Sequence, residues 1–321
     1  MTTHNNTPPL PTSAPHDPHP RKPKVTLPPG ACDTHAHVFG PGNKYPFLST
    51  GLYTPADAPP GDYRHMLNTL GVENCVLVQP SVYGTNNDAM LDAIALDPQR
   101  TRGVAVVPLD AETKEIERLH TKGVRGVRFN VVDVKAGKGQ FELEPIRKLA
   151  ERIRPFGWHV EFLMHVDEQP QLDTLFENFP TPISFGHLGY VLPPSRGTDL
   201  PGFQALLRLM RDGKAWVKLT APYRLSGHAT PYPDVDPFAQ ALMDAAPERL
   251  IWGSDWPHVH PRPGGPGGPP LERAMPNDGD LFDIFSHWVP DAHLRRQILV
   301  DNPAQLFGFA VSTRGGAGGR A

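Results

Sequence analysis

CVLVQ at residues 75–79 and GVAVVP at residues 103–108 are short and almost continuously apolar. A strand with one face in water alternates apolar and polar residues, whereas a parallel strand that is covered on both faces does not. The two runs therefore predict parallel strands inside a sheet that has helices on both sides.

Six further runs of this kind lie along the chain, at 31–34, 124–130, 159–165, 183–187, 215–220 and 250–255. Cys32 and Ile251 are 219 positions apart, which gives seven intervals of about 31 residues each. This spacing matches a repeating strand-helix unit and does not suit hairpins. Helical periodicity predicts helices between the runs, at 88–96, 112–122, 144–154, 171–179, 202–211 and 236–245.

These patterns predict an α/β protein whose catalytic domain, residues 31–310, is a (β/α)8 TIM barrel. The span has 280 residues, close to the roughly 250 that are typical of this fold. A doubly wound sheet is the alternative, but no Gly-rich phosphate loop follows the first run. The closed barrel is therefore favoured.

The two ends of the chain differ from this core in composition. Residues 1–30 contain nine prolines and few aliphatic side chains, which predicts a disordered or surface-draped arm. A polyproline segment that binds a partner, or an arm that laces an oligomer, is the alternative. Residues 311–321 contain four glycines and predict a flexible tail.

Charge and composition exclude several classes of partner. The net charge is −3, so we expect no nucleic-acid partner, and no apolar run approaches the roughly 18 residues that span a bilayer. The chain has only two cysteines and no apolar secretory segment at its N-terminus. These features predict a cytoplasmic protein, either a monomer or a small homo-oligomer.

Polar residues end the predicted strands, where a barrel carries its active site. The first run leads into His35 and His37, which alternate onto one side of an extended chain. The later runs end in Arg128, Asn130, His165, His187, Lys218 (followed by Tyr223 and Arg224) and Asp255. Burying so many ionisable groups costs too much for packing alone to explain. His258 and His260 follow in a loop that could cover the mouth of the barrel.

Three motifs resemble those of the amidohydrolase superfamily: DTHAH at 33–37, FGHLG at 185–189 and WGSDWP at 252–257. The core from 31 to 309 is similar to the branch of that superfamily that contains 2-pyrone-4,6-dicarboxylate lactonase. Further stretches carry this similarity, at 37–41, 54–58, 78–87, 125–130, 157–160 and 301–303.

The resemblance implies hydrolysis of the ring ester of a carboxylated lactone or pyrone, as in the catabolism of aromatic compounds or sugar acids. Asp255 would be the general base, and His35, His37 and His187 would polarise the carbonyl. Arg128 and Arg224 resemble the clamps for a substrate carboxylate. Other residues expected to contact substrate or line the mouth are Tyr53, Ser81, Asn130, Tyr223, His165, Tyr83 and Asn87.

The sequence departs from the lactonase pattern at two positions. Val134 stands where a second arginine is expected, with Lys135 and Lys138 nearby, and Leu163 stands where the pattern has an inward tyrosine. A second substrate carboxylate is therefore expected to be absent, differently placed or bound by a lysine.

Many members of the superfamily bind zinc, adding a bridging carboxylated lysine or a glutamate on the fourth strand. Arg128 and Asn130 end that strand here and neither is a ligand, so we expect no two-metal site. Because the branch includes metal-independent members, we expect no cofactor. The alternative is a single Zn²⁺ or other divalent metal on His35, His37, His187 and Asp255.

Other functions use the same residues. A zinc-dependent decarboxylase and a lactone isomerase are the alternatives within the superfamily, and a binding protein without turnover is a third. The insertion PRPGGPGGPP at 261–270 follows the last strand. It is either a spacer or a lid over the site.

Overall fold

The computed structural model describes residues 12–49, 53–132, 142–192, 196–259 and 275–310. Eight parallel strands form one sheet in which each strand pairs with the next along the chain. The strands are β1 (Cys32–Ala36), β2 (Asn74–Val78), β3 (Thr101–Ala105), β4 (Val124–Asn130), β5 (His159–Leu163), β6 (Ile183–Phe185), β7 (Ala215–Leu219) and β8 (Leu250–Trp252). Just beyond β8, the amide of Asp255 donates to the carbonyl of His35 in β1 at 2.8 Å, so the sheet closes on itself. The predicted (β/α)8 barrel is confirmed.

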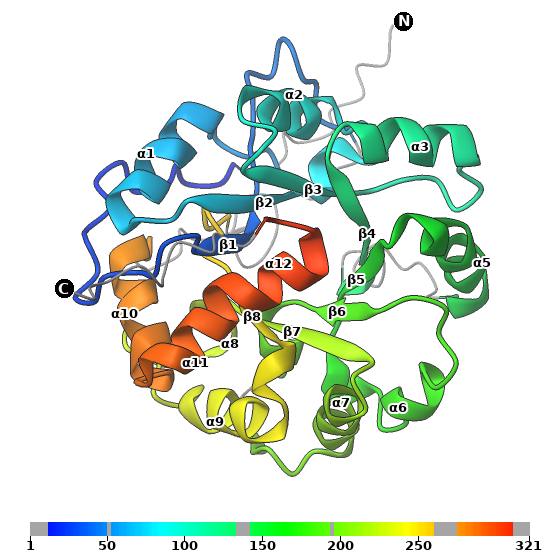
Figure 1. The fold of residues 1–321 in the computed structure, drawn as a ribbon. Coiled ribbons are helices and arrows are strands. Elements are labelled where there is room, and N and C mark those ends of the chain that lie inside the picture. Colours follow the sequence, from blue (N-terminus) through cyan, green and yellow to red (C-terminus); the bar gives the residue numbers. More distant parts are fainter. Residues whose placement is uncertain (1–11, 50–52, 133–141, 193–195, 260–274, 311–321) are drawn as a thin grey trace, which may run out of the picture.

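The helices lie outside the strands, most of them in a ring around the barrel (Figure 1). They are α1 (Pro60–Leu70), α2 (Asp88–Leu96), α3 (Thr113–Thr121), α5 (Leu143–Ile153), α6 (Leu172–Leu175), α7 (Pro201–Arg211), α8 (Pro222–Leu225), α9 (Asp236–Ala245), α10 (Asp278–Trp288), α11 (Ala292–Arg296) and α12 (Asn302–Phe307). The predicted helix at 171–179 is wrong beyond α6. The rings of Phe176 and Phe179 pack on Phe162 from turns, and Pro180 disfavours a helical residue before it.

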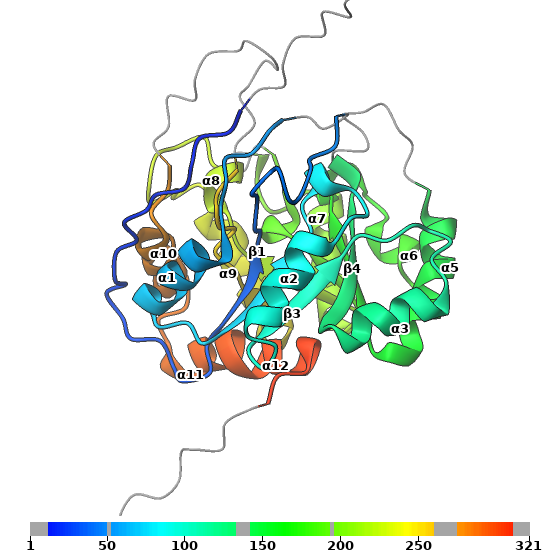
Figure 2. The ribbon, with the colours of Figure 1, turned by 90° about the horizontal axis from the view of Figure 1, so that it is seen from above.

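Helix α12 crosses one end of the barrel, and Figure 2 shows α11 beside it at the same end. The ring of Phe307 in α12 lies 5.2 Å from the ring of His159, the first residue of β5. These contacts cover the N-terminal ends of the strands. The C-terminal ends, with the polar residues predicted there, lie at the opposite end.

Residues 12–30, here called the N-terminal strap, pack against the barrel. The amide of Arg21 donates to Asn277 Oδ1 at 3.0 Å and that of Lys24 to Asp283 Oδ1 at 2.7 Å, while Leu27 is buried. Of the two forms predicted for the arm, disordered or surface-draped, residues 12–30 adopt the surface-draped one, because acceptors from α10 and its N-cap satisfy the extended backbone. Residues 1–11 and 311–321 lie outside the described residues.

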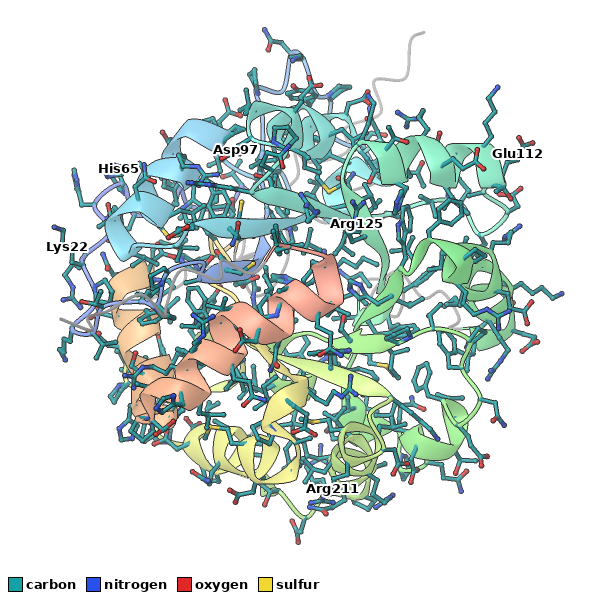
Figure 3. All side chains as sticks on the ribbon, viewed as in Figure 1. Lys22, His65, Asp97, Glu112, Arg125 and Arg211 are labelled. Carbon is teal, nitrogen blue, oxygen red and sulfur yellow. The ribbon has the colours of Figure 1, made fainter. Side chains whose placement is uncertain are left out.

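Charged side chains cover the outside of the molecule. Figure 3 shows Lys22, His65, Glu112 and Arg211 at the periphery, pointing away from the strands. The buried charged groups described next are therefore the exception in this protein. None of the helices among the described residues is long and apolar enough to cross a membrane.

Candidate active site

The junction of β1 with the segment after β8 positions the central residues of the site. Asp33 Oδ1 and Oδ2 accept from the amide and hydroxyl of Ser254 at 2.9 and 2.5 Å. Gly253 lies so close to β1 that a Cβ there would be 2.6 Å from the Cβ of His35. Only glycine allows this approach, so the Gly-Ser pair of WGSDWP brings Asp255 against the histidines.

Asp255 is buried, and its two carboxylate oxygens have different surroundings. Oδ2 accepts from the Tyr223 hydroxyl at 2.5 Å and from Arg224 Nε at 2.7 Å. Oδ1 has no hydrogen-bond partner among the described residues and lies 3.5 Å from His35 Nε2 and 4.0 Å from His37 Nε2. Burial would raise the pKa of Asp255, but Arg224, together with the Tyr223 hydroxyl and the other polar neighbours, outweighs burial and holds the pKa well below its usual range. The group is an ionised carboxylate with one oxygen available.

Backbone strain marks the same positions. Asp255 has φ of +64° and His187 has φ of +50°, in the left-handed region that residues other than glycine rarely adopt. Such conformations cost on the order of 1–3 kcal/mol each and persist where the surrounding structure enforces them. The fold therefore enforces the orientation of these two side chains.

The two histidines of β1 and its end are fixed as different tautomers. His37 Nδ1 donates to the carbonyl of Val78 at 2.7 Å, which leaves a lone pair on its Nε2. Lys218 Nζ donates to His35 Nδ1 at 3.2 Å, so His35 carries its proton on Nε2, facing Asp255. One ring thus offers an acceptor to the site and the other a donor.

All three imidazoles are neutral at physiological pH. Burial lowers the pKa of His37 to about 4 and that of His187 to about 3, and it holds the pKa of His35 well below its ordinary value. The rings of His35 and His187 meet edge to face, with centroids 5.3 Å apart. Sequence reasoning placed these three residues together, and the structure brings them together.

A buried ion pair lies beneath His35. Lys218 Nζ is 2.6 Å from Glu161 Oε2 and donates to the carbonyl of Thr34 at 2.7 Å. Burial lowers the pKa of Lys218. At Glu161 burial would raise the pKa, but the Lys218 and Arg128 cations with the other neighbours together outweigh burial and lower the pKa of that carboxyl. Sequence reasoning missed Glu161, although a carboxylate inside the apolar run HVEFL was a signal for it.

A cavity of about 180 Å³ opens beside Asp255. It is lined by His37, Tyr53, Pro80, Ser81, Arg128, Asn130, Val132, Leu163, His187, Tyr190, Arg224, Asp255 and Val259. Of the predicted contact residues, Tyr53, Ser81, Arg128, Asn130 and Arg224 are therefore here, whereas Tyr223, Tyr83 and Asn87 are not. His165 is not, because its Nδ1 lies 2.7 Å from the carbonyl of Tyr190 and its ring stacks on that of Tyr190. Tyr190, which sequence reasoning missed, takes its place.

Arg128 supplies a buried positive charge to this cavity. Its guanidinium donates one hydrogen bond to the carbonyl of Gln79 at 3.0 Å, and its Nε is buried without a partner in the part of the chain that the structure describes. No carboxylate within the described residues pairs with it. Asn130 Nδ2 donates to Ser81 Oγ at 3.0 Å on the same wall. A buried cation of this kind requires an anion, so the wall is suited to a carboxylate or sulfonate.

Leu163 and Val132 give the cavity an apolar surface, as expected at position 163. Val134, Lys135 and Lys138 lie outside the described residues, as do His260 and the 261–270 insertion. Arg224 lines the cavity, but its Nε binds Asp255 and its terminal NH2 donates to the carbonyl of Val259 at 2.8 Å. Its contact with a substrate carboxylate stays a prediction.

His35, His37 and Asp255 could hold a single metal ion. One ligand atom from each lies within 4.8 Å of the other two, and two imidazoles with a carboxylate suit Zn²⁺. Ligation through His35 Nε2 requires its proton on Nδ1, where Glu161 Oε1, 3.5 Å away, is the acceptor. The donor set therefore fits one divalent cation, provided that His35 changes its tautomer.

Comparison with known proteins identifies the family. Residues 32–309 match the amidohydrolase family model. The chain is 37% identical over 300 residues to the 2-pyrone-4,6-dicarboxylate hydrolase of Comamonas testosteroni, covering 90% of this chain and 93% of that one. It is 39% identical over 282 residues to the 4-sulfomuconolactone hydrolase of Rhizobium radiobacter, covering 88% and 91%.

A crystal structure agrees with these matches. A probable 2-pyrone-4,6-dicarboxylic acid hydrolase of Acinetobacter baumannii, solved with citric acid bound, superposes with a TM-score of 0.74 at 31% identity. The match covers 87% of this chain and 100% of that one. From the family match over residues 32–309 and these relatives, the chain belongs to the amidohydrolase family.

Proposed function

We propose that this protein hydrolyses the ring ester of a lactone or pyrone that carries a carboxylate or sulfonate. The observation that carries the proposal is Asp255, whose Oδ2 accepts two hydrogen bonds while its buried Oδ1 faces neutral imidazoles. Arg128 lines the same cavity and pairs with no carboxylate among the described residues. Relatives at 37% and 39% identity are named as hydrolases of such lactones, which supports it.

Asp255 Oδ1 takes a proton from the attacking water in this proposal. The lone pair on His37 Nε2, 4.0 Å from Oδ1, helps to orient that water as a second acceptor. A carboxylate with a depressed pKa is a weak base. Holding the water against the carbonyl compensates for this weakness, because positioning removes much of the entropic cost of the encounter.

The histidines act on the carbonyl. His35 donates from Nε2 and stabilises the negative charge that develops on the carbonyl oxygen, with the neutral His187 beside it. Water oxygen bonds to the carbonyl carbon, the ring C–O bond breaks, and Asp255 returns its proton to the leaving oxygen. The products are one new carboxylic acid and one hydroxyl group on an opened chain.

Arg128 binds the anionic substituent of the ring, and the apolar surface of Leu163 and Val132 accepts the remainder. We propose that no metal is required, because Lys218 holds His35 as the tautomer that donates from Nε2. A single ion on His35, His37 and Asp255 would supply Lewis-acid polarisation of the carbonyl.

Acid release in a weakly buffered solution tests the proposal. The purified protein is mixed with muconolactones, carboxylated pyrones and sugar lactones, with and without a chelator. We expect one proton per ring opened for a carboxylated lactone, at a rate that the chelator leaves unchanged. Loss of activity that zinc restores would contradict the metal-independent route. Consumption of substrate without new acid would indicate an isomerase, and release of CO2 a decarboxylase.

A further inference from the structure

Three buried polar side chains extend behind Asp255, and none of them lines the cavity. They are Tyr223 in α8, His258 in the turn after Asp255, and Asp278, the first residue of α10. His258 is 0% exposed and Asp278 1% exposed. Groups buried this deeply are expected to have a specific reason to be polar.

The three form a continuous chain of contacts with the base. The Tyr223 hydroxyl donates to Asp255 Oδ2 at 2.5 Å, and the same hydroxyl oxygen is 3.2 Å from His258 Nδ1. His258 Nε2 is 3.0 Å from Asp278 Oδ1. The series Asp278, His258, Tyr223 and Asp255 thus links the N-terminus of α10 to the site.

The number of protons available assigns a role to each atom. A carboxylate only accepts hydrogen bonds, so His258 Nε2 carries a proton and donates a hydrogen bond to Asp278 Oδ1. With a single proton on the ring, Nδ1 is then an acceptor. Among the described residues the hydroxyl proton of Tyr223 therefore has two acceptors within reach, and it goes to the nearer, charged Oδ2 of Asp255.

The far end of this chain of contacts is firmly held. Asn277 caps α10 by accepting from the amide of Gly279, and its Oδ1 also accepts from the amide of Arg21 in the N-terminal strap. The strap packs so closely that a Cβ on Gly279 would lie 2.3 Å from the carbonyl oxygen of Arg21. His258 is fixed as well, because its amide donates to the carbonyl of Asp255 at 2.8 Å.

We propose that His258, anchored by Asp278, is a positioning residue that acts on Asp255 through Tyr223. While Asp255 is ionised, Tyr223 and Arg224 hold Oδ2 and direct Oδ1 at the water. Once Oδ1 has taken a proton, the carboxyl group is a poorer acceptor, and His258 Nδ1 then receives the Tyr223 O–H by rotation of that bond alone. The inference rests on the proposed role of Asp255 as the base.

A double-mutant cycle tests this inference in the acid-release assay. His258→Phe keeps a ring of similar size but removes both nitrogens, and we expect kcat to fall about tenfold, the worth of one buried hydrogen bond, with KM unchanged. Tyr223→Phe also lowers kcat. Because His258 acts through Tyr223, the double variant should be no slower than Tyr223→Phe. Additive losses of kcat, or a rise of KM in place of a fall in kcat, would overturn the proposal.

Two further variants separate positioning from folding. Asp278→Asn keeps an oxygen that accepts from His258 and should retain most of the turnover, whereas Asp278→Ala should lose as much as His258→Phe. This pair also decides the matter if His258→Phe does not fold. His159→Phe is the matched control, since His159 is equally buried but lies beside α12. It should lower the melting temperature and leave kcat unchanged, and an equal loss of kcat there would contradict the proposal.

Wild-type turnover, measured in the same assay, separates this inference from the proposed function. A wild-type protein that releases no acid from any lactone contradicts the proposed function. An active wild type together with fully active His258→Phe contradicts only the role of His258.

Discussion

Arg128 is the single side chain with the clearest consequence for substrate binding. Its guanidinium is buried, donates to the carbonyl of Gln79 and has no carboxylate partner in the described residues. We predict that Arg128→Met raises KM about 10- to 100-fold, the worth of a hydrogen bond to a charged group, with a smaller effect on kcat. Steady-state kinetics on a carboxylated lactone measure this. Arg128→Lys is the control, and it should recover only part of the affinity, because an ammonium lacks the planar fork.

A second prediction concerns the effect of Lys218 on metal binding. Without its ammonium, Glu161 Oε1 is the remaining partner of His35 Nδ1, so the proton moves there and Nε2 becomes a potential ligand. Lys218→Met should therefore bind Zn²⁺ at least about tenfold more tightly than the wild type. Zinc titration followed by metal analysis after dialysis checks this. Lys218→Met/Glu161→Gln is the control without the acceptor charge, and equal affinities in all three proteins would contradict the prediction.

Position at a strand end made several single residues predictable. His35, His37, His187, Arg128 and Asp255 each follow or end a buried apolar run, and the barrel brings such positions together.

Other residues of the site carried a weaker signal or none. Glu161 lies within its strand, and its importance depends on Lys218 two strands away. Tyr190 reaches the cavity from a residue with φ of +53°, a backbone conformation that no local pattern announced. His258 was expected in a loop over the mouth, but the structure buries it behind Asp255.

Among the elements, the N-cap residue of α10 stabilises both this helix and the N-terminal strap. Asn277 caps Gly279 and also binds the strap at Arg21 and at the carbonyl of His19. Asn277→Ala should therefore lower the free energy of unfolding by about 2 kcal/mol, more than the roughly 1 kcal/mol of a simple cap. Asp291→Ala, which removes the cap of α11 from Leu294, is the matched control. Urea unfolding compares the two, and equal losses would show that the strap contributes nothing through Asn277.

The barrel elements were predictable because their spacing is regular and their burial is local. β4, α2 and α9 coincide with their predicted ranges, since apolar residues recur there with the period of the element. The packing of the strap on α10 could not be predicted because its partners, Asn277 and Asp283, lie more than 250 residues away along the chain. Proline content showed only that the segment could not form helix or sheet, which does not exclude packing.

For the whole molecule, the neutral buried histidines predict loss of stability in acid. Burial lowers the pKa of His37 and His159 to about 4 and of His187 to about 3. As the pH falls below 6.5, the ordinary histidine pKa, these histidines take up protons in the unfolded chain before they do so in the folded protein. The stability that the neutral histidines contribute is therefore complete above pH 6.5 and is lost as the pH falls toward 4. Asp33 has the opposite effect on stability. Burial raises its pKa from the ordinary 3.8 to about 6, so between these pH values Asp33 stabilises the folded protein as the pH falls.

Three imidazoles lose their stabilising effect as the pH falls and one carboxyl gains one, so the net result is a loss of stability. We predict that the free energy of unfolding falls on the order of 4 kcal/mol between pH 6.5 and about 4.5. Urea midpoints across this range measure it. His159→Phe should reduce the slope without touching the site, and a flat profile in the wild type would contradict the assignment of neutral imidazoles.

The central claim is that Asp255 is the base of a lactone hydrolase. The most direct test is kcat of Asp255→Asn on the carboxylated lactone that the wild type opens fastest, in metal-depleted buffer. The amide preserves the size of the side chain but cannot take a proton, so we expect kcat to fall about 10²- to 10⁴-fold while the variant keeps its affinity for the product acid. Turnover within a few-fold of the wild type would show that another group activates the water and that Asp255 is not the base.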